Sequence, residues 1–418
     1  MNKKNIIIIF ILINIVLTNQ KIIIPMDESQ SNHLKAYGIA YSSLKNGYKV
    51  EWLLNYRGGS FLLDVSEKIK RNCNLKGVSY QELNIEEISM IFSTIEEYNM
   101  EIILLEKPPK IAVYSPPKKQ PWDDAVTLAL TYAEIKYDII FDDEVMNGEL
   151  TKYDWLHLHH EDFTGQYGKF YRYRNKDWYK NMEKDFILTA KKYNFSSVHK
   201  FKKAIALKIK NYINNGGFLF AMCSATDSFD IALSFYSTDF VHQIYDNTPI
   251  DNNYMSKVDY SNGIAFENYE LYTDPTIYEY SNIDFPSSHK PITRSAESDY
   301  FTLSNFSAKW DPVPSMLTQN HVNNINGFMG QTTGYNKNYL KSHVVILAED
   351  LYSEQVKYIH GKVGKGTFTF LGGHDPEDYR HFVGDPPTDL DLHRNSPGYR
   401  LILNNILFPA AKKKKKKT

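Results

Sequence analysis

Short apolar runs alternate with longer amphipathic stretches from residue 21 onward, which is the pattern of strands followed by helices. An apolar run at 21–25 leads into a stretch with helical spacing over 31–45, which closes on Asn46 and Gly47, a typical helix end. The same unit is predicted to hold strands at 50–54 and 101–105 and helices over 65–72 and 85–98. Because strands alternate with helices, we expect this N-terminal α/β domain, residues 21–107, to contain a parallel sheet.

A stiff stretch, Lys107-Pro108-Pro109-Lys110, separates this unit from a second one that spans residues 110–410. Its predicted strands are at 111–114, 138–141, 155–160, 218–222, 344–347 and 366–371, and its predicted helices at 122–135, 200–213 and 399–407. Between about 236 and 340 the chain is rich in Tyr, Asn, Ser and Pro and has no sustained period. Since this is much longer than an ordinary connection, we predict an inserted subdomain or lid with short strands.

The first residues predict a targeting segment. Met1 to Lys4 is short and basic, and Ile6 to Leu17 is an apolar run of about a dozen residues, whereas a bilayer span needs roughly 20. A cleavable signal peptide over 1–20 and an exported bacterial protein, periplasmic or secreted, are therefore expected, with no transmembrane segment after its removal. The alternative is a buried first strand or helix.

The charge distribution argues against nucleic acid as a partner. The formal charge is −1, but eight of the 48 basic residues are Lys3, Lys4 and the run Lys412 to Lys417 in the tail at 411–418. Setting those eight aside leaves 40 basic against 49 acidic residues, a body of about −9. Clustered positive charge supplies most of the affinity for nucleic acid, and this body lacks it. Two cysteines exclude a disulfide scaffold and a four-cysteine zinc site.

One cysteine follows the most apolar predicted strand directly. Residues 218–222 run into Cys223, and a helix is expected to start immediately behind it. A thiol at a helix N-terminus is favoured as the reactive thiolate, and the small residues Ala221 and Ala225 suit a sharp strand-to-helix turn. The alternative is a buried structural cysteine, and this segment alone does not separate the two.

A second segment supplies a candidate base. His374 lies just beyond the strand at 366–371, with Asp375 and Glu377 close enough in sequence to orient its ring. A nucleophilic cysteine needs a nearby base, which in turn needs a carboxylate partner. We therefore predict that the Cys223 sulfur lies within about 5 Å of a His374 ring nitrogen. The alternative is a loop histidine with solvated carboxylates.

The segments Ala221-Met222-Cys223-Ser224-Ala225 and Gly373-His374-Asp375-Pro376-Glu377 resemble the class I glutamine amidotransferase-like superfamily. The resemblance covers residue 111 to about 408 and implies a flavodoxin-like three-layer α/β sandwich preceded by the smaller α/β domain. It implies Cys223 as nucleophile, His374 as base and Glu377 as the orienting carboxylate, with Asp375 as the alternative. The chain departs from the family by carrying alanines in place of the two elbow glycines and Asp227 in place of a glutamine.

The whole chain after the signal also resembles exported bacterial proteins labelled asparagine synthetase B. The matching stretches are residues 24–33, 54–60, 221–226 and 372–377. Asparagine synthetase activity is not expected, because the pyrophosphate-binding Ser-Gly-Gly-x-Asp-Ser sequence is replaced by Arg57-Gly58-Gly59-Ser60.

Two further polar clusters are candidate substrate contacts. Asp27 and Glu28 follow the first strand and Arg57 follows the next, where a guanidinium could clamp a carboxylate or phosphate. The alternative is helix capping by Asp27 or Ser29, together with an Arg57 ion pair between the two domains. His159, His160 and Glu161 lie at the end of the strand at 155–160, where they are candidate substrate contacts. The alternatives are a polar strand end whose groups are satisfied within the protein and a metal site, and the spacing is no specific metal signature.

These patterns predict an exported Cys-His hydrolase or amidase that acts on a C–N or related acyl bond of a small molecule. No cofactor or metal is expected. The alternative is a non-catalytic carbohydrate- or peptide-binding protein on the same fold, because fold alone does not decide activity.

Overall fold

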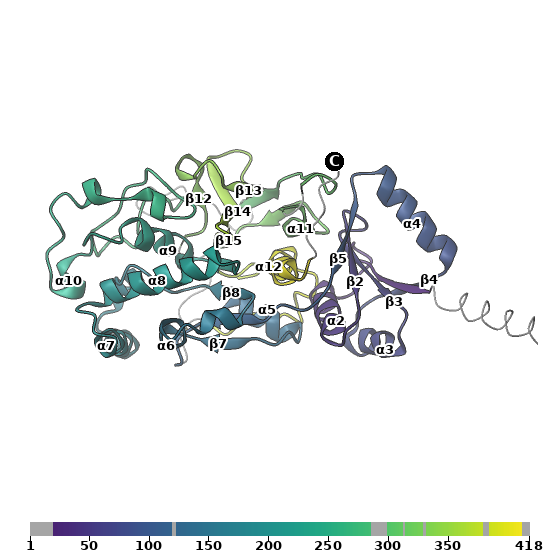
Figure 1. Ribbon diagram of the computed structural model, residues 1–418, viewed down its shortest axis with the longest axis horizontal. Coiled ribbons are helices and arrows are strands. Elements are labelled where there is room, and N and C mark those ends of the chain that lie inside the picture. The colour runs from purple at the N-terminus through teal and green to yellow at the C-terminus, as the bar shows by residue number, and fades with distance from the viewer. Residues whose placement is uncertain are drawn as a thin grey trace, which may run out of the picture.

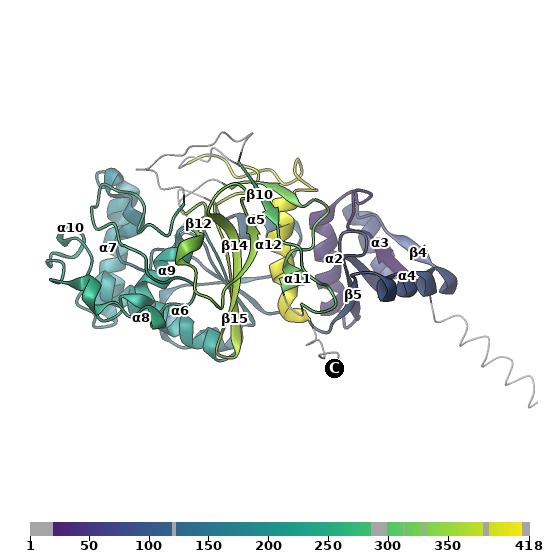
Figure 2. The ribbon, with the colours of Figure 1, turned by 90° about the horizontal axis from the view of Figure 1, so that it is seen from above.

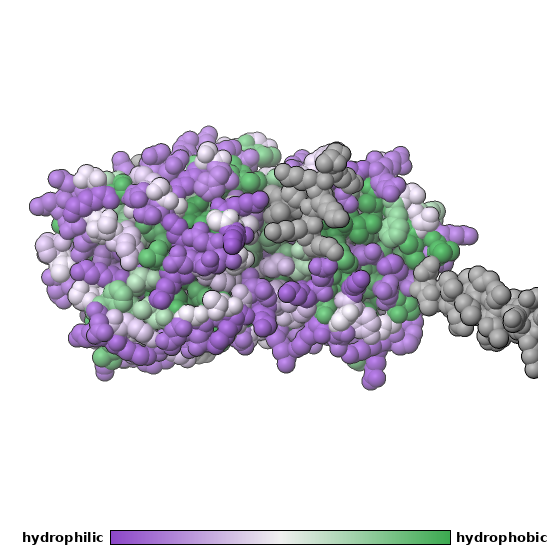
Figure 3. All heavy atoms as spheres, in the orientation of Figure 1, coloured by the Kyte–Doolittle hydropathy of each residue, from purple (hydrophilic) through white to green (hydrophobic). Residues whose placement is uncertain are grey.

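The structure is a computed structural model that describes residues 20–118, 123–285, 299–311, 314–328, 332–378 and 384–411. The predicted signal peptide up to residue 19, the lysine run and parts of the predicted insertion lie outside the described residues. None of the described helices is both long and apolar enough to cross a membrane. The face drawn in Figure 3 is largely hydrophilic, and its hydrophobic residues show in separate patches.

The N-terminal unit is built on a five-stranded sheet. Its strands lie in the order β4 (Gln81–Leu83), β1 (Lys21–Ile24), β3 (Ser60–Asp64), β2 (Val50–Leu54) and β5 (Glu101–Leu105). The helices of this unit are α2 (His33–Lys45), α3 (Glu67–Lys76) and α4 (Ile85–Glu97). The three predicted strands and three predicted helices of this segment are present, whereas β3 and β4 were not predicted.

The prediction of a parallel sheet in this unit is wrong, because all four strand pairings in it are antiparallel. The strand β3, which the pattern of apolar residues did not indicate, pairs with both β1 and β2. Only residues 55–59 connect β2 to β3, and so short a connection can join antiparallel strands but not parallel ones. β3 thus lies between the two strands that α2 connects.

A larger mixed sheet forms the second unit (Figure 1). Its strand order is β11 (Asn324–Asn326), β10 (Tyr300–Leu303), β13 (Val345–Glu349), β14 (Gln355–Val363), β15 (Gly366–Leu371), β9 (Phe218–Met222), β8 (Trp155–Leu158), β6 (Ile111–Tyr114) and β7 (Asp138–Ile140), with β12 (Tyr335–Asn336) paired to β14. The strands from β15 to β7 are parallel, and those from β11 to β14 are antiparallel. The short strands β10 and β11 of the Tyr- and Asn-rich segment thus extend the main sheet.

Helices cover both faces of this sheet. The helices of the second unit are α5 (Ala125–Tyr132), α6 (Asp142–Met146), α7 (Asp177–Lys192), α8 (Val198–Asn214), α9 (Ser224–Ser234), α10 (Gln243–Asp246), α11 (Pro314–Leu317) and α12 (Pro397–Leu407). The predicted helices at 200–213 and 399–407 correspond to α8 and α12, whereas α7 was not predicted.

Alternate residues of the central strand β9 enter two different hydrophobic cores. Phe218 and Phe220 pack in the core that contains α2, α5 and α12, while Leu219 and Ala221 pack in the core that contains α8 and α9. Figures 1 and 2 both show α12 beside α2, and the two helices are in contact. The small unit and the large unit therefore share one continuous core.

Candidate functional site

Three adjacent parallel strands bring the main polar residues together. β8, β9 and β15 are neighbours, with Leu158 paired to Ala221 and Leu371 paired to Met222. His159 and Cys223 come directly after their strands, and His374 follows two glycines after the third. Because the carboxyl ends of parallel strands meet at one edge, open α/β sheets place ligand sites there. Cys223, His159 and His374 thus lie at the sheet edge where the site is predicted.

Cys223 occupies a strained turn between β9 and α9. Its backbone has φ 50° and ψ −138°, a conformation that residues other than glycine rarely adopt. It is the N-cap of α9, and its carbonyl accepts hydrogen bonds from the backbone N–H and the hydroxyl of Thr226, at 3.3 and 2.8 Å. The side chain is only 4% exposed. Backbone strain of this kind is concentrated at functional sites.

Three histidines surround the Cys223 sulfur. His374 Nδ1 and His159 Nε2 are 2.8 Å apart, and the rings of His159 and His160 stack with centroids 4.0 Å apart. One side-chain nitrogen from each of the three histidines and the sulfur of Cys223 all lie within 4.8 Å of one another. The predicted proximity of Cys223 and His374 is therefore confirmed.

A carboxylate continues this polar chain beyond the histidines. Asp124 Oδ2 lies 3.4 Å from His159 Nδ1 and 3.1 Å from His157 Nε2. Burial opposes ionisation of Asp124, but the two imidazoles hold its pKa well below the usual range. The sequence analysis missed this residue, whose one visible signal was an N-cap position: its Oδ1 accepts the N–H of Thr127 at 2.8 Å.

Glu377 lies elsewhere than expected. Its carboxylate pairs with His393 Nδ1 at 3.2 Å. The ring of His374 instead lies against His159. Asp375 is held by the hydroxyls of Tyr399 and Thr388, at 2.7 and 2.8 Å. Asp375 and Glu377, the two carboxylates close to His374 in the sequence, thus pair with residues other than His374.

His160 and Glu161 connect the cluster to a cavity. His160 Nε2 lies 2.6 Å from the carbonyl of Asp123, and Glu161 accepts the N–H of His159 at 2.8 Å. Burial lowers the pKa of His159 and His160, so both rings are neutral at pH 7, and burial raises the pKa of Glu161 to about 7. His160 and Glu161 thus lie in the wall of the cavity and His159 does not, and their contact with a substrate stays a prediction.

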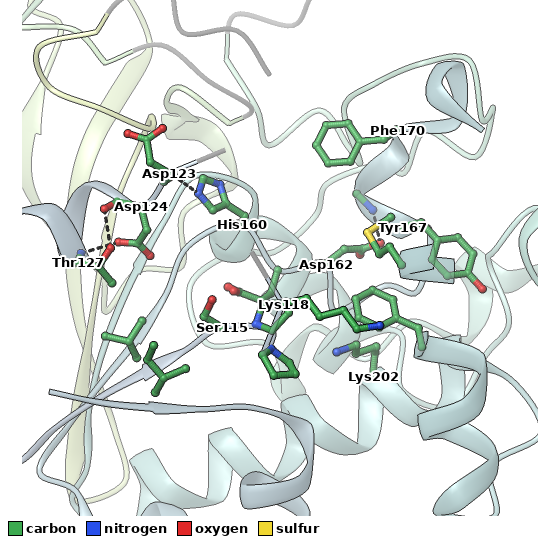
Figure 4. A pocket seen from close by; sticks show the side chains of 18 of the residues that line it. Ser115, Lys118, Asp123, Asp124, Thr127, His160, Asp162, Tyr167, Phe170 and Lys202 are labelled. Carbon is green, nitrogen blue, oxygen red and sulfur yellow. Dashed lines mark hydrogen bonds between the residues drawn. The ribbon is translucent and has the colours of Figure 1, made fainter. Parts of the chain in front are cut away.

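The cavity has a volume of about 400 Å³ and lies beside this cluster. Figure 4 shows Asp123, Asp124 and His160 on one side of it and Tyr167 and Phe170 on the other. Its wall also includes Ser115, Lys118, Glu161, Asp162, Phe186 and Lys202. A hollow of this size, with aromatic walls and a few polar groups, suits a small ligand.

The other predicted contact group lies in the N-terminal unit and outside this cavity. Arg57 Nε donates to Asp27 Oδ2 at 2.7 Å, and Arg57 Nη2 donates to Ser29 Oγ at 2.9 Å. Burial opposes ionisation of Asp27, but Arg57 lowers its pKa. Glu28, Asp27 and Arg57 do not line the cavity described above. The structure thus gives Arg57 an ion pair within the N-terminal unit, whereas the ion pair expected as the alternative was one between the two domains.

No family model and no curated protein matches the chain. Among solved structures, a cytoplasmic protein from Salmonella typhimurium LT2 is similar over 72% of this chain and 100% of its own, at 11% identity and a TM-score of 0.36. A second cytoplasmic protein from Salmonella typhimurium covers 73% of this chain and 100% of its own, at 10% identity and a TM-score of 0.33. A β-galactosidase from Bacillus circulans sp. alkalophilus covers 69% of this chain and 31% of its own, at 12% identity and a TM-score of 0.26. Likenesses this distant carry no argument about fold or function.

Proposed function

We propose that this protein is a cysteine-dependent hydrolase or amidase of the class I glutamine amidotransferase-like type. The observation that carries the proposal is the row of neighbouring groups at one sheet edge, in which the Cys223 sulfur lies within 4.8 Å of a ring nitrogen of His374, His374 lies 2.8 Å from His159, and His159 lies 3.4 Å from Asp124. The order of the parallel strands, β7-β6-β8-β9-β15, supports it further, because numbering those five strands along the chain gives 2-1-3-4-5, the flavodoxin-like order.

The series provides a route for one proton. His374 would take the proton of the Cys223 thiol as the sulfur attacks the acyl carbon, and would then give it to the departing amine. Water would cleave the resulting thioester, releasing the acid and restoring the thiol. His159 and Asp124 would orient His374 and stabilise its cationic form, the role that Glu377 was expected to play.

The turn at Cys223 would also stabilise the negative charge that develops on the substrate oxygen. The backbone N–H that follows a nucleophile in such an elbow points to the reacting carbonyl, and here it belongs to Ser224, the first residue of α9. The cavity beside His160 would bind the rest of a small substrate. The proposal includes export, on the basic and apolar start of the chain, and it does not include asparagine synthesis.

Selective alkylation tests the proposal, because the chain carries its own reference thiol. Cys73 is fully buried in a hydrophobic core, and burial raises its pKa to about 12. With EDTA present, iodoacetamide should modify Cys223 at least about 10-fold faster than Cys73 at mildly acidic pH. Peptide mass spectrometry would give the two rates.

Amide and ester probes then test the reaction itself. Wild type should turn over or retain at least one such electrophile, and Cys223→Ala should do neither. The burial of Cys223 favours the alternative, a non-catalytic carbohydrate- or peptide-binding protein. Equally slow alkylation of both thiols, with no probe turned over, would establish that alternative over the hydrolase.

A further inference from the structure

The same cluster has the composition of a transition-metal site. Its donors are three imidazole nitrogens, from His159, His160 and His374, and the sulfur of Cys223. Nitrogen and thiolate donors select zinc and related ions over magnesium and calcium, which prefer oxygen. We propose that these four residues bind one Zn²⁺ ion. The proposal does not require Cys223 to be a nucleophile.

The spacing of the donors suits a tetrahedral ion. Zn–N bonds of about 2.0–2.1 Å and a Zn–S bond of about 2.3 Å place the donors of a tetrahedral site roughly 3.3–3.6 Å apart. Here His374 Nδ1 and His159 Nε2 are 2.8 Å apart, and one donor atom from each of the four residues lies within 4.8 Å of the others. Small shifts of the side chains, some closer and some farther apart, would therefore bring all four onto one ion.

Groups behind the histidines hold two rings in the orientation that a metal requires. The Nδ1 atom of His159 faces Asp124, which leaves Nε2 directed toward the cluster. The Nε2 atom of His160 contacts the carbonyl of Asp123, which leaves Nδ1 as its donor. Metal-binding histidines almost always use their second nitrogen in this way, toward a carboxylate or a backbone carbonyl.

Negative groups lie close to the position of such an ion. The Cys223 thiolate would bind it directly, and the Asp124 carboxylate lies behind His159. Opposite charges at short range reduce the free energy that burying a cation costs. A neighbouring group, Asp124 with His157 and His159, is a less suitable site because Asp124 already pairs with both of those rings.

Under the proposed function, an ion at this position would suppress hydrolysis. The metal would occupy the sulfur lone pair that attacks the substrate and a nitrogen of the base. Hydrolysis would then require removal of the ion, so the protein would be active after chelation and inhibited by one equivalent of Zn²⁺. This consequence rests on the proposed function, whereas the binding itself does not.

Cobalt substitution tests the site directly and without an activity assay. The full chain, stripped with EDTA and dialysed, should bind one equivalent of Co²⁺ with a tetrahedral visible spectrum and a thiolate-to-cobalt charge-transfer band. One equivalent of Zn²⁺ should abolish both. Cys223→Ser should lose the charge-transfer band, and His160→Ala should bind Zn²⁺ at least about 10-fold more weakly in competition with a chromophoric chelator.

Two variants serve as matched controls and a third tests the groups behind the ligands. Cys73→Ala removes the other thiol, and His393→Ala removes a histidine that pairs with Glu377; both should bind like wild type. Asp124→Asn should weaken Zn²⁺ binding by about 10- to 100-fold. Circular dichroism would confirm that each variant is folded.

Three results would each overturn the proposal: Co²⁺ that does not saturate at one equivalent, a charge-transfer band that persists in Cys223→Ser, or one that disappears in Cys73→Ala. If Zn²⁺ fails to bind while Cys223 still alkylates selectively in EDTA, the metal site is refuted and the proposed function stands. If Zn²⁺ binds and no probe is hydrolysed by the metal-free protein, the metal site stands and the proposed function is refuted.

Discussion

Because of the backbone conformation of Cys223, changing alanine to glycine at this position should not lower the stability of the protein, whereas the same change at a neighbouring helical position should. A residue with a Cβ held at φ 50° and ψ −138° costs about 1–3 kcal/mol, and glycine relieves that strain. We therefore compare Cys223→Ala with Cys223→Gly, two variants that both lack the sulfur. The control is Ala225→Gly in α9, a fully buried alanine that does not share the positive φ.

The expected difference follows from three contributions. Changing alanine to glycine removes one buried methyl group, about 0.8 kcal/mol, and adds roughly 0.5–1 kcal/mol of backbone entropy. At residue 225 these should destabilise the protein by about 1.5 kcal/mol. At residue 223 a relief of about 2 kcal/mol opposes them. The glycine variant there should be as stable as the alanine variant or up to about 1 kcal/mol more stable.

Equilibrium urea unfolding in EDTA, followed by tryptophan fluorescence, measures these differences. The comparison is valid where the denaturant slopes of the variants agree, because the slope reports the surface exposed on unfolding. If glycine costs the same about 1.5 kcal/mol at residue 223 as at residue 225, the elbow stores no strain. The argument from strain to function would then fail.

Three further changes test other parts of the structure. Burial and the nearby charge of Arg400 lower the pKa of His33 to about 4, so between pH 6.5 and 4 the unfolded chain takes up a proton that the folded chain does not. His33 should thus lower stability by up to about 3 kcal/mol as the pH drops through that window, in addition to the effects of His199, His321 and His360, whose pKa values burial also lowers. His33→Gln should make the urea-unfolding profile shallower by that amount, and parallel profiles of wild type and variant would contradict this assignment. Lys202 and Asp142 form a buried ion pair at 2.8 Å, so Asp142→Asn should lower the free energy of unfolding in urea by about 3–5 kcal/mol. Most of that loss should be recovered in the double variant Asp142→Leu/Lys202→Met. An undiminished loss in the double variant would argue against an unpaired charge as the cause. Asp124→Asn should slow iodoacetamide alkylation of the elbow cysteine at least about 10-fold in EDTA, and an unchanged rate would remove Asp124 from the proton route.

The sequence alone was sufficient to predict which residues lie close together where those residues follow neighbouring parallel strands. Cys223 and His374 each follow an apolar strand, and parallel strands end at a common edge, so their proximity could be predicted. The helices at 198–214 and 397–407 were visible from their spacing. The antiparallel N-terminal sheet was not visible, because the pattern of apolar residues does not say which strands become neighbours.

The partners of His374 were decided by tertiary structure alone. Glu377 is three residues away in sequence, yet its carboxylate pairs with His393. His159 follows β8 and Asp124 precedes α5, both far away along the chain. His159 meets the His374 ring, and Asp124 lies behind His159, because β6, β8, β9 and β15 lie in one sheet. Spacing in sequence limits which groups can be close, but a side chain's partner depends on where its backbone directs it.

The sequence by itself therefore determined the residue types and their place at strand ends, because hydrophobic periodicity and turn residues act locally. Only the tertiary structure decided that three imidazoles gather around one sulfur with a carboxylate behind them. That arrangement depends on the order and direction of strands, which long-range packing selects. It changes the candidate from a cysteine with one base to a four-donor cluster that suits both thiol chemistry and a metal ion.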